Sequence, residues 1–212
     1  MMRYDVINRI AEKINAQSYL EVGVQNPDSC FRKVNISHKV GIDPIINFGR
    51  GYEEKENETL LEITSKEFLS LGLTKNPQTF DIIFIDGLHT RKQCLWDVEW
   101  ALERLNEHGA IIVHDTLPIA EEQQTKEDNG KEWTGEAWKV ISEYHLERAG
   151  VEVTTVDTDW GCSILQFNKN KKQSLTLLLH VFFDDPFIWE NYVQYRNELL
   201  NVISVNEFLR RF

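Results

Sequence analysis

Two patterns of hydrophobic and polar residues alternate along the chain. Short apolar runs are typical of buried strands, whereas apolar residues that recur every three or four positions are typical of amphipathic helices. Strands are predicted at residues 18–24, 39–44, 60–63, 80–87, 110–115, 151–156 and 162–167. Helices are predicted at residues 4–15, from about 29, at 64–71, 90–105 and 133–148, and in one or two segments from about 189.

This alternation predicts an α/β fold, a doubly wound, Rossmann-like three-layer sandwich. Its sheet is expected to be mostly parallel and seven-stranded, with an antiparallel hairpin at the C-terminal end. The strand at residues 80–87 is almost continuously apolar, so we expect it at the centre, where helices cover both faces. We expect residues 1–170 to form the domain and residues 171–212 to form a helical extension packed on it.

Net charge, cysteine spacing and the first ten residues limit the expected partners and cellular location. The 23 Lys and Arg residues against 34 Asp and Glu give a net charge of −11, which repels nucleic-acid phosphates and anionic membranes. Three separated cysteines without a CxxC pair fit a reducing cytoplasm. The first ten residues are interrupted by charges and predict neither a signal peptide nor a membrane span.

Four predicted strands end in polar groups, and ligands bind at this edge of such sheets. The groups are Glu21 with Gly23, Asp43, Asp86, and His114 with Asp115.

The first two of these strand ends have the features of an adenosine site. Gly23 would let a ligand approach the backbone, and Asp43 would accept both ribose hydroxyls. Val24 and Asn26 stand in the turn where a dinucleotide site would carry further glycines, which favours a nucleoside without phosphates over NAD. The alternative is that Gly23 only makes a tight turn and Asp43 only caps a strand.

Several longer strings resemble one family over residues 19–167. They are YLEVGV at 19–24, VGIDP at 40–44, FDIIFIDGLHT at 80–90, GAIIVHDT at 109–116 and WTGEAWK at 133–139. They resemble the class I S-adenosylmethionine-dependent methyltransferases, specifically small bacterial methyltransferase-domain proteins. The resemblance implies methyl transfer from S-adenosylmethionine, with an oxygen of a small molecule or sugar expected as the acceptor atom.

Carried over residue by residue, the resemblance places Glu21 and Gly23 near the methionine and ribose of the cofactor. It places Asp43 on the ribose hydroxyls, Ile45 or Ile46 against the adenine, and Thr64 and Ser65 near the adenine edge. Asp86 would lie near the methionine ammonium or the acceptor. Since the sulfonium is already activated, alignment and desolvation matter more than any single catalytic group.

Asp86, His89, His114 and Asp115 form a second candidate group. In one interpretation Asp86, His114 and Asp115 hold a divalent ion, magnesium or manganese, that lowers the pKa of the acceptor hydroxyl. In another, His89 or His114 is a general base without a metal. In a third, His89 caps a helix and His114 is a hydrogen-bonded core residue.

Other features extend the hypothesis. The acidic segment 116–131 is expected to be a mobile loop that closes over the site, and Trp133, Trp138 and Trp160 could wall an acceptor pocket, although core packing is at least as common for tryptophan. The run from residue 189 to 212 could cover the sheet edge or form a homodimer contact. Two rival functions remain, an NAD-dependent oxidoreductase and a nucleoside-binding module without catalysis.

Overall fold

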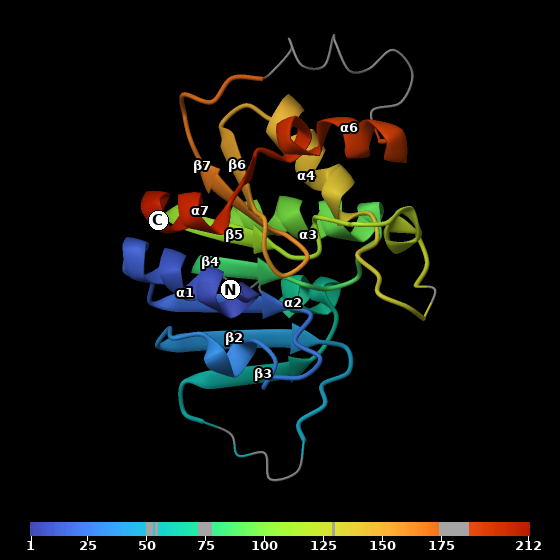
Figure 1. Ribbon diagram of the computed structural model, residues 1–212. Coiled ribbons are helices and arrows are strands. Elements are labelled where there is room, and N and C mark those ends of the chain that lie inside the picture. Colours follow the sequence, from blue (N-terminus) through green and yellow to red (C-terminus); the bar gives the residue numbers. More distant parts are fainter. Residues whose placement is uncertain (50–52, 54, 72–77, 129, 174–186) are drawn as a thin grey trace.

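The structure is a computed structural model, and it describes residues 1–49, 53, 55–71, 78–128, 130–173 and 187–212. One sheet lies between two layers of helices (Figure 1). Its strands are β1 (Ser18–Val22), β2 (His38–Asp43), β3 (Glu58–Glu62), β4 (Phe80–Ile85), β5 (Leu105–Val113), β6 (Val151–Val156), β7 (Cys162–Phe167) and β8 (Val202–Ile203). Its helices are α1 (Arg3–Ile14), α2 (Ser65–Leu71), α3 (Arg91–Arg104), α4 (Ala137–Glu147), α6 (Trp189–Leu200) and α7 (Val205–Arg211), with 3₁₀ turns at Phe31–Lys33 and Glu121–Gln124.

The strand order is β3-β2-β1-β4-β5-β7-β6-β8. β7 pairs antiparallel with both β5 and β6, while the other strand pairs are parallel. The predicted α/β class and antiparallel hairpin are therefore confirmed. The predicted count of seven strands is wrong by one, because β8 is a two-residue strand, too short to show a period of two in the sequence.

Side chains alternate between two cores along each strand. On one face, Ile83 and Ile85 pack with α3, α4 and α6. On the other, Ile82 and Phe84 pack with α1 and α7. The strand predicted to be central is thus buried from both sides, and the sheet edge at its carboxyl end is held between two packed layers.

Three predicted elements differ from the structure by more than the shifts of one or two residues seen at the ends of others. Where a helix was predicted from about residue 29, the structure has a 3₁₀ turn at Phe31–Lys33. Helix α4 begins at Ala137 rather than at Trp133. Gly135 has φ +60°, outside the helical region, which delays the helix start. No loop separates α3 from β5: Phe80 pairs with Leu105 and Ile82 with Ala110, so the polar residues in between form an irregularity inside the strand.

The described residues 187–212 pack on the same sheet. β8 adds to the sheet beside β6, and Tyr192, Leu199 and Leu200 of α6 join the core of α3 and α4. The division into 1–170 and 171–212 stays a prediction, since residues 174–186 lie outside the described residues. Among the helices described, none is long and apolar enough to cross a bilayer.

Candidate active site

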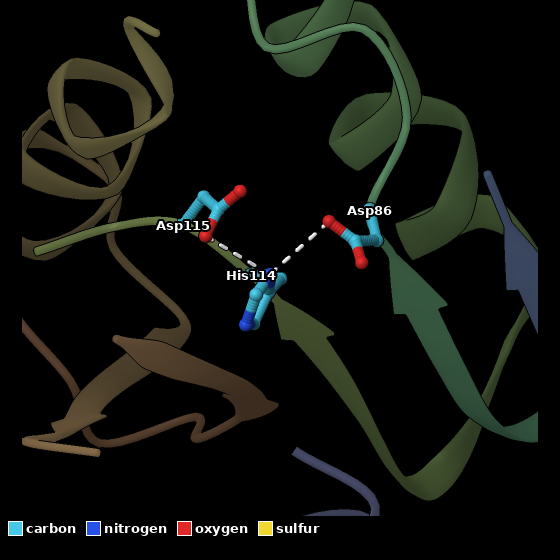
Figure 2. A group of neighbouring side chains, drawn as sticks. All are labelled: Asp86, His114 and Asp115. Atoms are coloured by element: carbon cyan, nitrogen blue, oxygen red, sulfur yellow. Dashed lines mark hydrogen bonds and ion pairs between the residues drawn. The ribbon is translucent and has the colours of Figure 1, made fainter. Parts of the chain in front are cut away.

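The carboxyl ends of β4 and β5 carry Asp86, His114 and Asp115, which face one another (Figure 2). The amide of Asp86 donates to the carbonyl of Val22 at 2.8 Å, and that of His114 donates to the carbonyl of Ile85 at 3.0 Å. These bonds continue the parallel ladders one residue past each strand. The backbone therefore fixes where the Asp86 and His114 side chains begin.

Two imidazoles bridge the two carboxylates. His114 Nδ1 lies 3.1 Å from both Asp86 Oδ1 and Asp115 Oδ1. His89, in the loop between β4 and α3, lies 3.3 Å from Asp86 Oδ1 through Nε2 and 3.2 Å from Asp115 Oδ2 through Nδ1. The Nδ1 atom of His89 is buried and forms no well-oriented hydrogen bond. The structure thus brings together all four residues predicted for this group, while their roles stay predictions.

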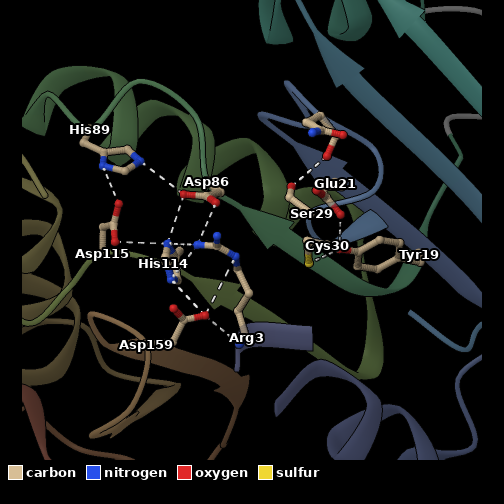
Figure 3. Close-up of polar contacts among 11 residues, drawn as sticks. Arg3, Tyr19, Glu21, Ser29, Cys30, Asp86, His89, His114, Asp115 and Asp159 are labelled. Atoms are coloured by element: carbon tan, nitrogen blue, oxygen red, sulfur yellow. Dashed lines mark hydrogen bonds and ion pairs between the residues drawn. The ribbon is translucent and has the colours of Figure 1, made fainter. Parts of the chain in front are cut away.

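Arg3 and Asp159 complete the group (Figure 3), and the sequence analysis missed both. Arg3 Nη1 lies 3.0 Å from each ring nitrogen of His114 and 3.5 Å from Asp86 Oδ2. Asp159, in the loop between β6 and β7, lies 3.7 Å from His114 Nε2. Arg3 follows no strand, so only the docking of α1 could have revealed it. Asp159 lies three residues past the end of β6, which runs in the same direction as β4 and β5, but the sequence pattern predicts only a hairpin turn there.

Charge dominates the protonation of this group. Burial lowers the pKa of His114, but the charge of Asp86 and hydrogen bonds to Asp115 and Asp159 raise it well above the usual 6.5. Burial likewise lowers the pKa of His89, and Asp86 and Asp115 raise it overall. Burial raises the pKa of Asp86, but His114 and His89 hold it far below its usual range. The ligand-free group therefore favours imidazolium side chains next to ionised carboxylates.

A short segment before α4 holds His89 in place. The Trp133 ring stacks on the His89 ring at 5.3 Å and 14°. The amide of Glu136 donates to the carbonyl of His89 at 2.7 Å. Of the other two tryptophans expected near an acceptor, Trp138 is fully buried in the core, and Trp160 is half-buried and accepts from the Leu117 amide through its carbonyl.

The turn after β1 packs directly on the end of β4. Gly23 has φ +92°, and a Cβ at this position would lie 2.1 Å from the carbonyl oxygen of Asp86. Glu21 is buried and accepts a 2.6 Å hydrogen bond from the Tyr19 hydroxyl. Burial raises the pKa of Glu21 to about 8, although the Tyr19 hydrogen bond opposes the shift. Gly23 is thus required here by backbone conformation and by contact with β4.

Asp43, at the end of β2, is oriented by backbone amides. Its Oδ2 accepts from the Gln25 amide at 3.0 Å and its Oδ1 from the Ile45 amide at 2.8 Å. Ile45 is 74% exposed, whereas Ile46 is buried, so Ile45 is the residue free to contact a ligand. Since each carboxylate oxygen can accept more than one hydrogen bond, Asp43 retains acceptor capacity.

Comparisons with known proteins agree with the observed fold. Residues 28–116 match the family model described as a methyltransferase domain. Over these residues the chain is similar to methyltransferase domains. The matched residues include Asp43, Asp86, His114 and Asp115 and begin after Glu21 and Gly23.

Three solved structures resemble this chain at 14% identity, which shows a shared fold. The O-methyltransferase TomG from Streptomyces achromogenes, in complex with S-adenosylmethionine, covers 78% of this chain and 79% of its own with a TM-score of 0.57. A Podospora anserina methyltransferase with bound S-adenosylhomocysteine covers 78% of each chain with a TM-score of 0.57. The O-methyltransferase from Bacillus cereus, in complex with S-adenosylhomocysteine, covers 78% and 80% with a TM-score of 0.54. No curated protein sequence matches this chain significantly.

Two of the residues predicted to bind the cofactor lie at the start of α2. Thr64 and Glu67 form a reciprocal cap, in which the Glu67 amide donates to Thr64 Oγ1 and the Thr64 amide donates to Glu67 Oε2. Ser65 Oγ accepts from Gln93 Nε2 of α3 at 3.2 Å. Both hydroxyls thus have local structural partners, and their contact with adenine stays a prediction.

Two hollows of about 430 and 700 Å³ lie away from the strand ends that carry the polar group. The smaller is lined by Arg32, Lys39 and Glu58 among others, and the larger by residues of α1 such as Asn8 and Glu12. Neither is lined by a candidate site residue. We therefore locate the site from its chemistry and its strand ends rather than from the size of a hollow.

Proposed function

We propose that this domain transfers the methyl group of S-adenosylmethionine to an oxygen of a small molecule or sugar. The observation that carries the proposal is the contact between Gly23 and the backbone of Asp86. Through it, the turn expected to hold the cofactor directly adjoins the Asp86, His89, His114 and Asp115 group. The O-methyltransferases of similar fold support oxygen as the acceptor atom.

The cofactor half fits a nucleoside. Asp43 has acceptor capacity for two ribose hydroxyls. The exposed side chain of Ile45 lies two residues further along the chain. S-adenosylmethionine, when bound, supplies an activated methyl group. The chain's own contribution is to orient the cofactor and to keep water from the reacting atoms.

His89 is the group that we propose to take the acceptor's proton. Its side chain is 11% exposed, compared with 1% for His114, so an acceptor reaches His89 more easily. Its ring lies between the carboxylates of Asp86 and Asp115, at 3.3 and 3.2 Å, which orient the imidazole. Because the pKa of His89 is raised, the neutral base gains population as the pH rises, and the rate should rise with it.

The predicted metal site does not fit the arrangement as it stands. Asp86, His114 and Asp115 each offer a ligand atom within 4.8 Å of the others, and magnesium or manganese would be held by these three. Magnesium and manganese prefer oxygen ligands, however, and Arg3 Nη1 lies 3.0 Å from both ring nitrogens of His114. We therefore route no step through a metal ion.

Two smaller parts of the proposal concern context. The three cysteines are free thiols, which supports the expected cytoplasmic location. A homodimer through the C-terminal segment remains a prediction that sedimentation of the purified protein would check.

Calorimetric titration with S-adenosylmethionine, S-adenosylhomocysteine and NAD tests the cofactor. We expect the first two to bind and NAD not to bind. Binding of NAD alone would favour the oxidoreductase, and cofactor binding without turnover on a panel of phenols, sugars and hydroxy acids would favour the non-catalytic module.

Two double variants then test the chemistry. We expect His89→Ala with His114→Ala, and separately Asp86→Asn with Asp115→Asn, each to lower methyl transfer by about 10²-fold, the usual scale for a lost general base. Full activity in both double variants would leave alignment and desolvation as the mechanism.

A further inference from the structure

Arg3 places a permanent positive charge inside the polar group at the ends of β4 and β5. Its Nη1 atom is 3.0 Å from both ring nitrogens of His114 and 3.5 Å from Asp86 Oδ2, and its Nε atom is 3.8 Å from Asp159 Oδ2. In Figure 3 the guanidinium points from the start of α1 into the group. An arginine does not lose this charge at any pH that a folded protein survives.

The fold holds this side chain in place. The Arg3 amide donates to Asp159 Oδ2 at 2.8 Å, so one carboxylate binds both the backbone and the side chain of Arg3. The Thr158 hydroxyl donates to the Met1 carbonyl next to it. Val6 and Ile7 of the same helix are fully buried against the sheet. Arg3 is therefore a built part of the site, with only 23% of its side chain exposed.

The charges around Arg3 show what it neutralises. Three carboxylates, those of Asp86, Asp115 and Asp159, surround His114. Among the ion pairs of the described residues, Arg3 is the one Lys or Arg side chain that reaches any of these three. Without it, the group would combine convergent carboxylates with imidazole nitrogens, which is a donor set suited to a transition-metal ion.

We propose that Arg3 is the resident cation of this site and that it takes the place of a divalent metal ion. An ion bound by Asp86, His114 and Asp115 would need ligands at about 2.0–2.2 Å, which would bring it against a guanidinium already in contact with two of those residues. The positive charge of Arg3 repels the ion, and its side chain fills the approach to the ligands.

The metal-binding part of this inference is independent of the reaction. Its catalytic part rests on the proposed function: Arg3 would stabilise the negative charge on the acceptor oxygen after the proton leaves. The test therefore uses metal binding, which can be read even if no methyl acceptor is found.

The experiment is a titration of the full chain with MnCl₂, followed by electron paramagnetic resonance of free Mn²⁺. We expect the wild-type protein to bind Mn²⁺ at this group at least ten-fold more weakly than Arg3→Gln. Asp115→Asn introduced into Arg3→Gln should abolish the gain, which assigns the new site to this group. Arg9→Gln, on the same helix but paired with Glu12, removes the same net charge and should behave as wild type.

Equal Mn²⁺ affinity in the wild type and in Arg3→Gln would overturn the inference. Tight, stoichiometric Mn²⁺ binding by the wild-type protein that Asp115→Asn removes would also overturn it. This second measurement does not depend on the folding of any Arg3 variant. Arg3→Lys keeps a positive charge on a similar stem, and we expect it to exclude Mn²⁺ as the wild type does. Metal binding by Arg3→Lys equal to that of Arg3→Gln would contradict the role of charge.

Discussion

The cofactor half and the acceptor half of this site hold their carboxylates in different ways. In the cofactor half, neutral groups do so: two backbone amides bind Asp43, and the Tyr19 hydroxyl binds Glu21. In the acceptor half, Asp86 faces His89, His114 and Arg3, all of which can carry positive charge. The neutral donors orient Asp43 and leave it spare lone pairs for ligand hydroxyls, whereas the charged partners of Asp86 set protonation states.

The two halves meet at one glycine, and the largest effect we predict is there. Gly23→Ala would place a Cβ 2.1 Å from the Asp86 carbonyl oxygen at φ +92°. We expect a loss of about 3 kcal/mol or more, since left-handed strain adds to a backbone collision that no rotamer relieves. Urea unfolding of the variant measures this loss.

Gly150→Ala is the matched control for Gly23→Ala. Gly150 has φ +80°, but nothing lies within 4 Å of an added Cβ. This variant should cost only about 1–2 kcal/mol, from the conformation alone. Equal losses in the two variants would mean that the contact between the halves contributes nothing.

The second prediction separates the halves by ligand. Asp43→Ala should weaken S-adenosylhomocysteine binding by about 2–3 kcal/mol, roughly 30- to 150-fold, the scale for losing charge-assisted hydrogen bonds. Asp28→Ala, at an exposed acid in the neighbouring turn that pairs with Arg32, should leave the affinity unchanged. Calorimetry on both variants decides, and an unchanged affinity in Asp43→Ala would remove this residue from the site.

The sequence predicted the four residues of the acceptor half because they share one feature, a place at or just after a parallel strand end. Asp86, His114 and Asp115 follow apolar runs, and parallel topology carries such residues to one edge. Arg3 begins α1 and follows no strand, so only the docking of that helix brings it to His114. Asp159 lies three residues past the end of β6, which runs in the same direction as β4 and β5, but it has φ +46° in a loop where the sequence pattern predicts only a hairpin turn.

The fold was predictable to the same extent and for the same reason. Runs of four apolar residues, such as residues 82–85 in β4 and 110–113 in β5, predict buried strands from the sequence. β8 has two residues and gains its place by pairing with Thr155 and Val156 of β6, which no local pattern encodes. The start of α4 depends on the positive φ of Gly135, where a Cβ would meet the His89 carbonyl.

The third prediction concerns the raised pKa of Glu21. Burial raises the pKa of Glu21 from 4.5 to about 8, so the folded state is penalised progressively as the pH rises from 4.5 towards 8. Glu21→Gln cannot ionise and should be more stable than the wild type by about 1–2 kcal/mol at pH 8.5, with little gain at pH 4.5.

Urea unfolding at the two pH values measures the effect of Glu21→Gln. Glu67→Gln is the control, because hydrogen bonds from Thr64 lower the pKa of Glu67. With the opposite shift, Glu67→Gln should show no gain at high pH. A stability difference of Glu21→Gln that does not change with pH would show that Glu21 is not neutralised by burial.

The smallest predicted effect lies in the loop at residues 116–131, expected from its composition to be mobile. In the structure the buried Gln123 holds both ends of this loop by hydrogen bonds. Its side-chain Oε1 accepts from the amides of Ile119 and Ala120, and its backbone carbonyl accepts from the amides of Thr134 and Gly135. Exchange should therefore be slow at these four amides and fast at the polar residues between them, and a cofactor or acceptor should slow the fast positions. Gln123→Ala removes only the side-chain bonds, so Ile119 and Ala120 should exchange faster by about 1 kcal/mol of local stability while Thr134 and Gly135 change little. Uniformly fast exchange in every state would instead show a surface loop without a role in binding. The stacking of Trp133 on His89 would then not depend on this loop.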